Sequence, residues 1–321
     1  MIVITGSSGF IGSCLLSKLN YLNFKDIVLV DNFDNDKKEK NYNNNIFSKK
    51  INRNDFFYWL NKNEKFIQFI FHLGARTNTL ETNIEILNEL NFQYSIKIWN
   101  SCVKFGIPFL YASSASVYGS GEFNFDDYDK NIDYYKPLNL YAQSKLKFDL
   151  WCLSQKKQPY FWAGLRFFNV YGPNEYHKGP MRSMVLNLFD QITSNQSVNL
   201  FKSHKSNYND GEQKRDFIYV KDVIEVLVFF LFNRKNSGIY NVGSGETYSF
   251  NYLANIIFEN CKIIPKFNYI DIPMSIREKY QYFTKSNQKK LRSIGFKYDF
   301  LPLREGIKDY YDNYLTSRSY F

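Results

Sequence analysis

The sequence contains little cysteine, no long apolar run and no basic tail. Its four cysteines are scattered without the paired spacing of a zinc ribbon or a disulfide framework, which indicates a reducing compartment and no metal site. The most apolar stretch, residues 223–232, is interrupted by Glu225 and falls short of the ~20 residues that a bilayer-spanning helix requires. The first ten residues carry no basic leader. We therefore expect a cytoplasmic protein without membrane insertion.

The composition is that of a folded protein with an excess of positive charge. The chain has 321 residues, of which 44% are hydrophobic, enough for one large or two medium domains and too many for a wholly disordered chain. The net charge of +10 comes from 41 lysines and arginines against 31 acidic residues. Polyanion binding would suit this charge. Because no arginine-rich tail or basic repeat is present, we interpret it as a compositional bias and expect no nucleic-acid partner.

Apolar runs alternate with helical spacing in the first half of the chain. This alternation predicts an α/β protein with a doubly wound (Rossmann) parallel sheet and a smaller C-terminal α/β substrate lobe. A polar loop without helix or strand is expected at residues 34–45, and irregular substrate-lobe structure at 203–214. The expected strands are residues 2–4, 27–30, 69–73, 108–112 and 164–169. One helix is expected after Gly12, a second ends near Phe105, and a third covers residues 140–153. A strand followed by a helix is expected over residues 216–232. The predicted dinucleotide domain comprises residues 1–170 and about 216–248, and the substrate lobe 171–215 and about 249–321.

Three glycines follow the first predicted strand and open the first helix. Gly6, Gly9 and Gly12 have the spacing GxxGxxG. Glycine allows a tight turn, a close approach of the backbone to a pyrophosphate and close packing of the helix on the sheet, and the helix start offers free N–H groups. In this strand–turn–helix context the glycines predict a dinucleotide site.

The end of the second predicted strand bears on the choice of cofactor. Asp31 stands where a carboxylate would bind the ribose, which favours NAD because a carboxylate repels a 2′-phosphate. Asn32, Lys37, Lys38 and Arg53 are nearby in sequence, and basic side chains there could bind the phosphate of NADP or be solvated loop charges. Both cofactors stay open at this point.

A tyrosine and a lysine share one face of a predicted helix. Tyr141 and Lys145 stand at i and i+4, and an ammonium beside a phenol favours the phenolate, so we expect a lowered tyrosine pKa. Such a tyrosine exchanges a proton with an alcohol near neutral pH. Upstream, Ser114 follows a predicted strand, at the sheet edge where ligands bind, and could donate a hydrogen bond to a hydroxyl group that is being oxidised.

These motifs together resemble the extended short-chain dehydrogenase/reductase superfamily. The likeness rests on TGSSGFIG, SSASVYG and YAQSK, and continues through RFFNVYGP, KRDFIYVKDV and YNVGSGETYS. It implies action on a nucleotide sugar with bound NAD or NADP, and it implies that Ser114, Tyr141 and Lys145 are the catalytic serine, tyrosine and lysine. The serine motif lacks the Asp-Glu pair of the sugar 4,6-dehydratases, which argues against dehydration.

Within this superfamily the chain resembles the ADP-L-glycero-D-manno-heptose 6-epimerase family of lipopolysaccharide core heptose biosynthesis. The most specific motif is NEYHKGPM, at residues 174–181. The resemblance implies that Lys178 is a second acid/base beside Tyr141, that NADP removes a hydride from carbon 6 of the heptose and returns it to the opposite face, and that the protein is a homo-oligomer, a pentamer in this family.

The resemblance also implies two sets of binding residues. The expected cofactor-binding residues are Gly6, Gly9, Phe10, Ile11, Gly12, Asp31, Asn32, Lys38, Arg53, Leu73, Gly74, Ala75, Arg76, Thr77, Asn91, Tyr141, Lys145, Val170 and Lys178. The expected substrate-binding residues are Ser114, Asn169, Pro180, Asn187, Phe201, Lys202, Ser203, His204, Arg215 and Tyr280. Leu73, Pro180 and Asn187 depart from the residues that the family has there. The alternatives are a 4-epimerase or reductase for another nucleotide sugar, and a non-catalytic NADP-sensing protein.

Overall fold

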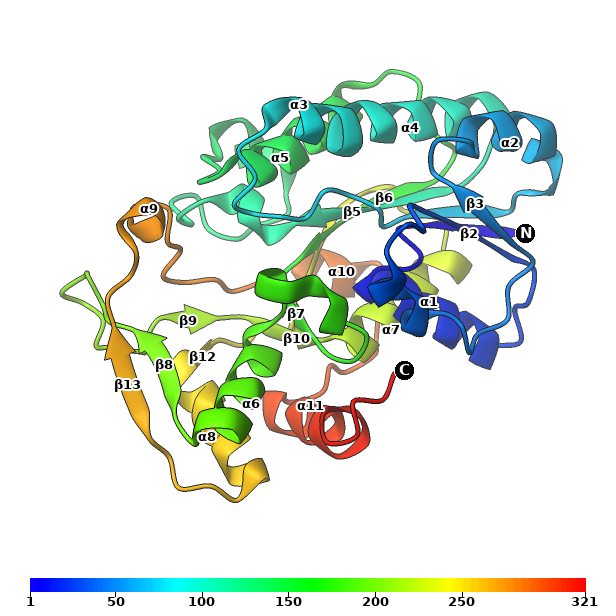
Figure 1. The fold of residues 1–321 in the computed structure, drawn as a ribbon. Helices are drawn as coiled ribbons and strands as arrows, with labels where there is room; N and C mark the ends of the chain where they lie inside the picture. Colours follow the sequence, from blue (N-terminus) through cyan, green and yellow to red (C-terminus); the bar gives the residue numbers. More distant parts are fainter.

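The structure, a computed structural model, describes the backbone of all 321 residues and every side chain except those of residues 129–131 and 275. A central sheet of seven parallel strands has the order β11-β6-β5-β4-β1-β2-β3 (Figure 1). This confirms the predicted doubly wound fold. The strands are β1 (Ile2–Thr5), β2 (Ile27–Asp31), β3 (Lys49–Asn52), β4 (Phe69–His72), β5 (Phe109–Ser114), β6 (Trp162–Phe167) and β11 (Gly238–Val242).

Helices cover both faces of the sheet, as parallel strands require (Figure 1). Since strands β1 and β4 are buried along their whole length, they read in the sequence as short continuous apolar runs. One face carries α2 (Phe56–Asn63), α3 (Ile84–Leu87), α4 (Tyr94–Phe105) and α5 (Leu140–Ser154), and the other carries α1 (Phe10–Tyr21) and α7 (Val220–Phe232).

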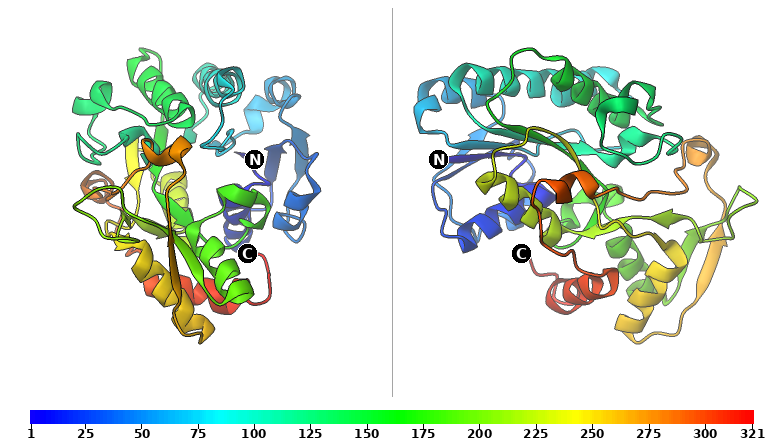
Figure 2. Two further views of the ribbon diagram at one scale, coloured as in Figure 1. Left: turned by 60° about the vertical axis from the view of Figure 1, so that its left-hand side comes forward. Right: turned by 180° about the vertical axis from the view of Figure 1, so that it is seen from behind.

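A second group of elements adjoins the sheet on the side of α1 and α7 (Figures 1 and 2). Its strands form short two-stranded pairs: β7 (Asn169–Tyr171) with β10 (Phe217–Tyr219), β8 (Val198–Phe201) with β13 (Phe267–Ile270), and β9 (Lys214–Arg215) with β12 (Tyr248–Ser249). Its helices are α6 (Met184–Asn195), α8 (Phe250–Cys261), α9 (Met274–Arg277), α10 (Lys289–Ser293) and α11 (Leu303–Tyr310).

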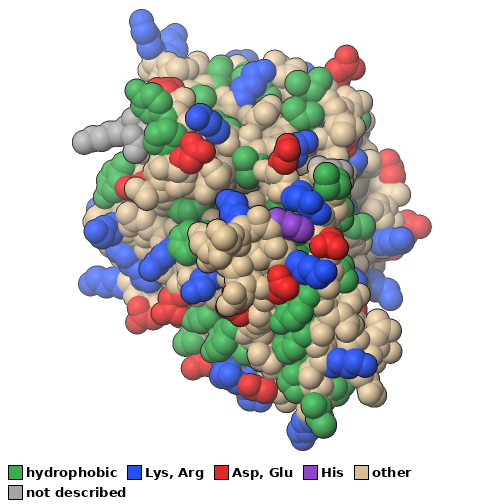
Figure 3. All heavy atoms as spheres, turned by 90° about the vertical axis from the view of Figure 1, so that its left-hand side faces the viewer, with side chains coloured by type: hydrophobic (Ala, Val, Ile, Leu, Met, Phe, Trp, Pro, Cys, Tyr) green, Lys and Arg blue, Asp and Glu red, His purple; other side chains and the backbone are tan. Residues whose placement is uncertain are grey.

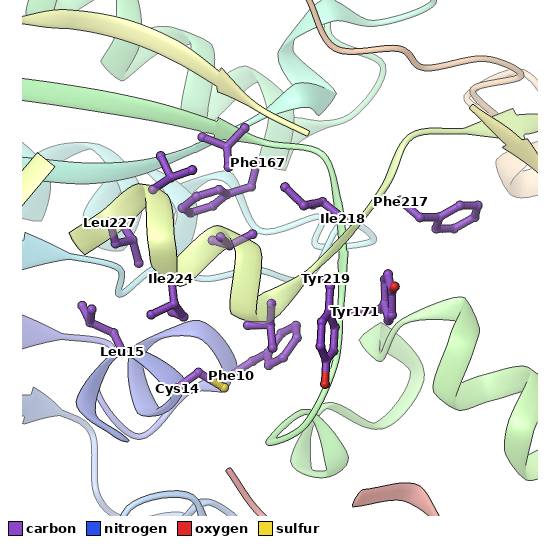
Figure 4. Packing of buried hydrophobic residues seen from close by; sticks show 14 of the residues in the cluster. Phe10, Cys14, Leu15, Phe167, Tyr171, Phe217, Ile218, Tyr219, Ile224 and Leu227 are labelled. Atoms are coloured by element: carbon purple, nitrogen blue, oxygen red, sulfur yellow. The ribbon is translucent and has the colours of Figure 1, made fainter. Parts of the chain in front are cut away.

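One apolar core joins the sheet to this second group. Phe10, Cys14 and Leu15 on α1 face Ile224 and Leu227 on α7 (Figure 4). The same cluster continues through Tyr171 and Tyr219, whose rings stack 5.2 Å apart, and reaches buried residues of α6, α8 and α11. The packing is therefore continuous across both parts of the molecule.

The polar segment 34–45 differs from its prediction as a loop without helix. Asp36–Asn41 form a 3-10 helix, whose start is stabilised because the Asn35 side chain accepts a hydrogen bond from the Lys37 amide. Asn41 and Tyr42 are buried, so the segment packs against the glycine turn. Asn-rich composition alone did not reveal this capped turn.

The structure also shows the lengths of the helices, the state of the cysteines and the distribution of charge on one face. No described helix is long and apolar enough to cross a membrane. All four cysteines are free, and the described side chains contain no cluster of three metal-ligating residues. On the face in Figure 3, lysine and arginine side chains are scattered and acidic side chains lie among them, which fits the interpretation of the net charge as compositional bias.

Candidate active site

The glycine turn lies between β1 and α1, where the strand order of the sheet reverses. Gly6 has φ +69°, and a Cβ atom there would lie 2.5 Å from the Gly74 amide nitrogen. A Cβ on Gly12 would lie 2.2 Å from the Gly6 carbonyl oxygen. Both positions therefore require glycine, because the turn, the loop after β4 and the start of α1 touch one another. Ligands of open α/β sheets bind in the crevice at this switch point.

The start of α1 is suited to an anion. Gly9 precedes the helix and contributes no side-chain cap, and the first turn, which includes Phe10 and Ile11, has no acidic residue. The hydroxyl groups of Ser7 and Ser8 are buried without a hydrogen-bond partner in the turn itself. Free helix N–H groups, the helix dipole and these donors fit the pyrophosphate of a dinucleotide.

Asp31 is held close to the turn by backbone donors. Its carboxylate accepts hydrogen bonds from the Ser8 amide at 3.0 Å and the Asn32 amide at 2.8 Å. The Lys38 ammonium lies 3.4 Å from Asp31 Oδ1, and the Arg53 amide donates to the Asp31 carbonyl at 3.0 Å. Of the basic residues that the sequence left as indicators of NADP, the structure therefore brings the side chain of Lys38 to the Asp31 carboxylate and the backbone of Arg53 to the same strand end.

The loop after β4 forms the opposite wall. Gly74 donates its amide to Thr5 Oγ1 at 3.3 Å, and the Arg76 amide donates to Asn91 Oδ1 at 2.7 Å. The Asn91 amide donates in turn to the Arg76 carbonyl and, at 2.9 Å, to Ser144 Oγ on α5. Asn91 thus ties the loop that contains Leu73, Gly74, Ala75, Arg76 and Thr77 to the helix of Tyr141 and Lys145.

A neutral histidine at the end of β4 supports the loop that follows this strand. The His72 ring lies between Thr5 Oγ1, at 2.6 Å from Nδ1, and Ser95 Oγ, at 2.9 Å from Nε2. Burial, with a smaller contribution from the charge of Lys145, lowers the pKa of His72 to about 3. The imidazole is therefore uncharged at neutral pH.

Ser114, Tyr141 and Lys145 meet at the carboxyl end of β5. The Ser114 hydroxyl lies near the Tyr141 phenol and accepts hydrogen bonds from the amide and the hydroxyl of Ser116, and the Lys145 ammonium donates to the Ala112 carbonyl at 2.8 Å. Asn139 caps the start of α5 by accepting from the Ala142 amide, which fixes the helix that carries both residues.

The electrostatics of this trio differ from the sequence prediction. Burial raises the pKa of Tyr141 to about 12, and only the hydrogen bond from Ser114 opposes this shift. Lys145 Nζ lies 6.0 Å from the centre of the tyrosine ring and is engaged with the backbone of β5. The expected lowering of the tyrosine pKa by Lys145 is therefore wrong for this structure. Burial instead lowers the pKa of Lys145 itself to about 8.

Lys178 comes from a separate element, the 3-10 segment Tyr176–Met181. Its ammonium lies 5.2 Å from the centre of the Phe10 ring, at the start of α1, and burial lowers its pKa. Gly179, with φ +55°, turns the chain directly after it. The structure therefore places Lys178 against the glycine turn, as a partly buried lysine in a cation–π contact.

The loop of Lys178 is anchored on both sides. The buried Glu175 carboxylate accepts hydrogen bonds from the Ser183 amide and hydroxyl and from Gly172, and burial raises its pKa. On the other side, His177 Nδ1 lies 3.1 Å from the amide nitrogen of Asn41. Neither Glu175 nor Asn41 was among the predicted site residues.

The second part of the molecule contributes an arginine set among aromatic rings. The Arg215 guanidinium is buried, lies 5.4 Å from the Tyr280 ring and 5.6 Å from the Phe250 ring, and donates to the Lys214 carbonyl at 2.9 Å. The Phe201 ring contacts Tyr280 edge-on at 5.7 Å. Arg215, Tyr280 and Phe201 are therefore brought together as the sequence predicts, and burial lowers the pKa of the arginine.

The other expected substrate residues have local partners in the structure. Asn169 accepts from the Thr284 hydroxyl at 3.5 Å, and Asn187 accepts from Gln191 on its own helix. Lys202 is paired with Asp271 at 3.8 Å, and Pro180 is exposed. Two more, Ser203 and His204, are fixed by Asp210 and Tyr282 through their backbone amides.

Two buried carboxylates that the sequence did not single out organise the surroundings. Asp149 accepts from Tyr111, Ser113 and Arg166 one turn after Lys145, and its charge opposes the lowering of the lysine pKa. Asp216 accepts hydrogen bonds from the 244–245 turn and from residue 286, so it joins the end of β11 to the C-terminal segment. Each lies within a quoted motif or beside one, but burial alone distinguishes it from surface acids.

The comparisons with known proteins agree with this geometry. The family model described as "NAD dependent epimerase/dehydratase family" matches residues 2–243. A relative from Fusobacterium nucleatum, named ADP-L-glycero-D-manno-heptose-6-epimerase, is 40% identical over 98% of both chains. One of the same name from Nitratidesulfovibrio vulgaris is 39% identical over the full length of both. The crystal structure of the Helicobacter pylori enzyme of that name has a TM-score of 0.80 at 31% identity and covers 96% of this chain and 94% of its own.

Proposed function

The chain belongs to the NAD dependent epimerase/dehydratase family and, within it, to the ADP-L-glycero-D-manno-heptose-6-epimerases, and on this basis we propose that it inverts carbon 6 of ADP-D-glycero-D-manno-heptose. The reaction is an oxidation and re-reduction at that carbon, in lipopolysaccharide core heptose biosynthesis. The observation that carries the proposal is the meeting of Ser114, Tyr141 and Lys145 at the end of β5, at the same edge of the parallel sheet as the glycine turn against which Lys178 lies.

Ser114 on β5, with Tyr141 and Lys145 on α5, would transfer one proton to or from the sugar alcohol. Tyr141, with its pKa raised to about 12, holds its proton at neutral pH and is therefore poised as the acid in one direction of transfer. Ser114 lies near the same phenol and would orient the sugar oxygen. Lys145 is held by the Ala112 carbonyl with its ammonium 6.0 Å from the centre of the Tyr141 ring, where it would bind the nicotinamide ribose.

Lys178 supplies the second proton path. Inversion requires that hydrogen leave one face of carbon 6 and return to the other, so a single acid/base on one side cannot serve both orientations of the sugar. Lys178 reaches the site from a different element than Tyr141, and its lowered pKa increases the fraction of neutral amine that can accept a proton. The bound nicotinamide supplies the hydride chemistry.

Arg215 is proposed to bind the diphosphate of the sugar nucleotide. A guanidinium pairs with phosphate oxygens through two parallel hydrogen bonds, and here Phe250 and Tyr280 hold its plane in place. The ring of Phe201 packed against Tyr280 extends the same wall. The division into a dinucleotide domain and a substrate lobe, with the residue ranges given above, remains part of the proposal.

NADP is the cofactor that we propose, with NAD as the alternative. Asp31 would repel a 2′-phosphate, but it already accepts two backbone hydrogen bonds and lies 3.4 Å from Lys38. The Lys38 ammonium is therefore close enough to Asp31 to offset that charge, and the backbone of Arg53 adjoins the same strand end. We also propose that the protein is a cytoplasmic homo-oligomer, and the family resemblance suggests a pentamer.

The direct test incubates the purified protein with ADP-D-glycero-D-manno-heptose and follows the configuration at carbon 6 by NMR. We expect conversion to the L-glycero epimer. No inversion of this substrate, together with turnover of UDP-galactose, would overturn the assignment in favour of a 4-epimerase. Release of the bound nucleotide by denaturation, followed by mass spectrometry, distinguishes NADP from NAD.

A further inference from the structure

A single buried asparagine connects the glycine turn to the loop of Lys178. Asn41 ends the 3-10 segment that follows β2 and is almost completely buried. Its amide nitrogen lies 2.8 Å from the Ser8 carbonyl oxygen and 3.1 Å from His177 Nδ1. The two contacts join parts of the chain that are 33 and 136 residues away from it.

The chemistry of the contacts fixes the direction of both hydrogen bonds. The Ser8 carbonyl can only accept, so the NH₂ group of Asn41 must face it. The second hydrogen of that NH₂ group then points to His177 Nδ1, which accepts it with the ring proton on Nε2. Burial and the charges of Lys38 and Lys178 lower the pKa of His177 to about 4, which agrees with a neutral, accepting imidazole.

The contacts hold a short and sharply turned loop at the point next to Lys178. Glu175 anchors the N-terminal side of the loop to α6, and Gly179 reverses the chain at φ +55°. His177 is hydrogen-bonded to Asn41 of the 36–41 segment, so Asn41 links this part of the loop to the glycine turn. A flexible lysine side chain needs such a fixed backbone to meet a small reacting group in one geometry.

We propose that Asn41 is a positioning residue for Lys178: its carboxamide ties His177 to the glycine turn and thereby sets the place of the second acid/base relative to the cofactor site. This rests on the proposed function, in which Lys178 moves a proton. Asn41 contacts the glycine turn at the Ser8 carbonyl oxygen, a group that cannot donate a hydrogen bond to a phosphate. Its loss should therefore lower kcat and leave cofactor affinity almost unchanged.

The test compares Asn41→Ala, His177→Ala and the double variant with wild type. At saturating NADP we expect each single variant to lose about tenfold in kcat, since small misplacements of a reacting group cost one to two orders of magnitude. The KM for the sugar nucleotide and the Kd for NADP should stay within about twofold. The double variant should be no slower than the slower single variant, because both remove one tether. His177→Gln, which keeps an acceptor, should recover part of the rate.

Asn43→Ala is the matched control, because Asn43 is an exposed asparagine just after the same segment. Hydrogen–deuterium exchange gives a readout without substrate: Asn41→Ala and His177→Ala should exchange faster over residues 174–183, and Asn43→Ala should not. If Asn41→Ala fails to fold, His177→Ala tests the same tether from the partly exposed side.

Wild-type kcat and wild-type exchange in Asn41→Ala would overturn the proposal. So would losses that multiply in the double variant, or a loss that disappears when NADP is raised, since the latter would make Asn41 a cofactor-binding residue. If wild type does not turn over ADP-heptose at all, the proposed function fails, and the exchange comparison still decides whether Asn41 holds the loop.

Discussion

The Ser114 hydroxyl lies close enough to the Tyr141 phenol to lower its pKa against the effect of burial, so the end of β5 and the first turn of α5 meet in the candidate active site. The two residues are 27 positions apart in the sequence and meet only because α5 packs on β5. A buried phenol with one hydroxyl partner is well placed to pass a proton to a bound alcohol.

Replacing Tyr141 by phenylalanine removes that proton and keeps the ring. We expect kcat to fall by roughly 10² to 10⁴, the usual contribution of a general acid/base, with NADP affinity unchanged. Initial rates by NMR and NADP titration by fluorescence measure the two effects. Tyr21→Phe, at a tyrosine that is 80% exposed, is the control. A Tyr141→Phe enzyme with full activity would exclude the phenol from catalysis.

Replacing Lys178 by methionine keeps most of the side-chain length and removes the amine. We expect normal NADP binding and a loss of epimerisation of at least about 100-fold, because one of two proton paths is gone. The exposed Lys156→Met is the matched control. Turnover like that of wild type would remove Lys178 from the mechanism.

Replacing Lys38 by alanine unmasks the Asp31 carboxylate. The ion pair at 3.4 Å disappears, so the negative charge of Asp31 acts undiminished on a 2′-phosphate. We expect the Kd for NADP to rise about 10- to 100-fold, the range for a lost charge-assisted contact, and the Kd for NAD to change less than about threefold. Calorimetric titration with both nucleotides measures this. Equal losses for the two cofactors would contradict the proposed preference.

His72 should make the stability of the protein depend on pH in the acid range. Its pKa is about 3 in the folded protein and about 6.5 when unfolded, so the unfolded chain binds the proton first. Stability from this group is complete above pH 6.5 and decreases by about 1.4 kcal/mol per pH unit as the pH falls toward 3. His177, with a pKa lowered to about 4, adds to the same trend.

Urea unfolding of wild type and His72→Gln at several pH values between 7 and 4.5 measures the effect. The variant should be less stable at pH 7 but should lose less stability on acidification. His204→Gln is the control, because its imidazole is exposed. Parallel pH dependence in wild type and His72→Gln would contradict the assignment.

The sequence predicted most of the strands that are buried on both faces but missed β11, which is buried along its whole length. Runs such as residues 2–5 and 69–72 are apolar throughout because parallel strands have no solvent face. Strand β3 was missed because it lies at the sheet edge and only Ile51 within it is buried. Helix α2 was missed as well; its sequence is largely aromatic, and two of its residues are buried.

Within the candidate site, spacing along one helix predicted adjacency but not orientation. Tyr141 and Lys145 do share a face of α5, yet the Lys145 ammonium turns to the Ala112 carbonyl, and burial controls the tyrosine pKa. Asn41 could not be found in the same way, because its partner His177 is 136 residues away and no local pattern links them. Contacts between segments that are far apart in the sequence can be identified only when the three-dimensional structure is known.

The apolar core that passes without interruption from α1 and α7 into α6, α8 and α11 limits how this protein can move. A hinge motion that separates the two parts of the molecule would expose that core to water, and its free-energy cost would rise in proportion to the apolar area exposed. We therefore expect the sugar nucleotide to enter and leave by local motion of surface loops. Between the two hydride transfers, the heptose would rotate within the site to present its other face, and the surrounding protein would keep its arrangement.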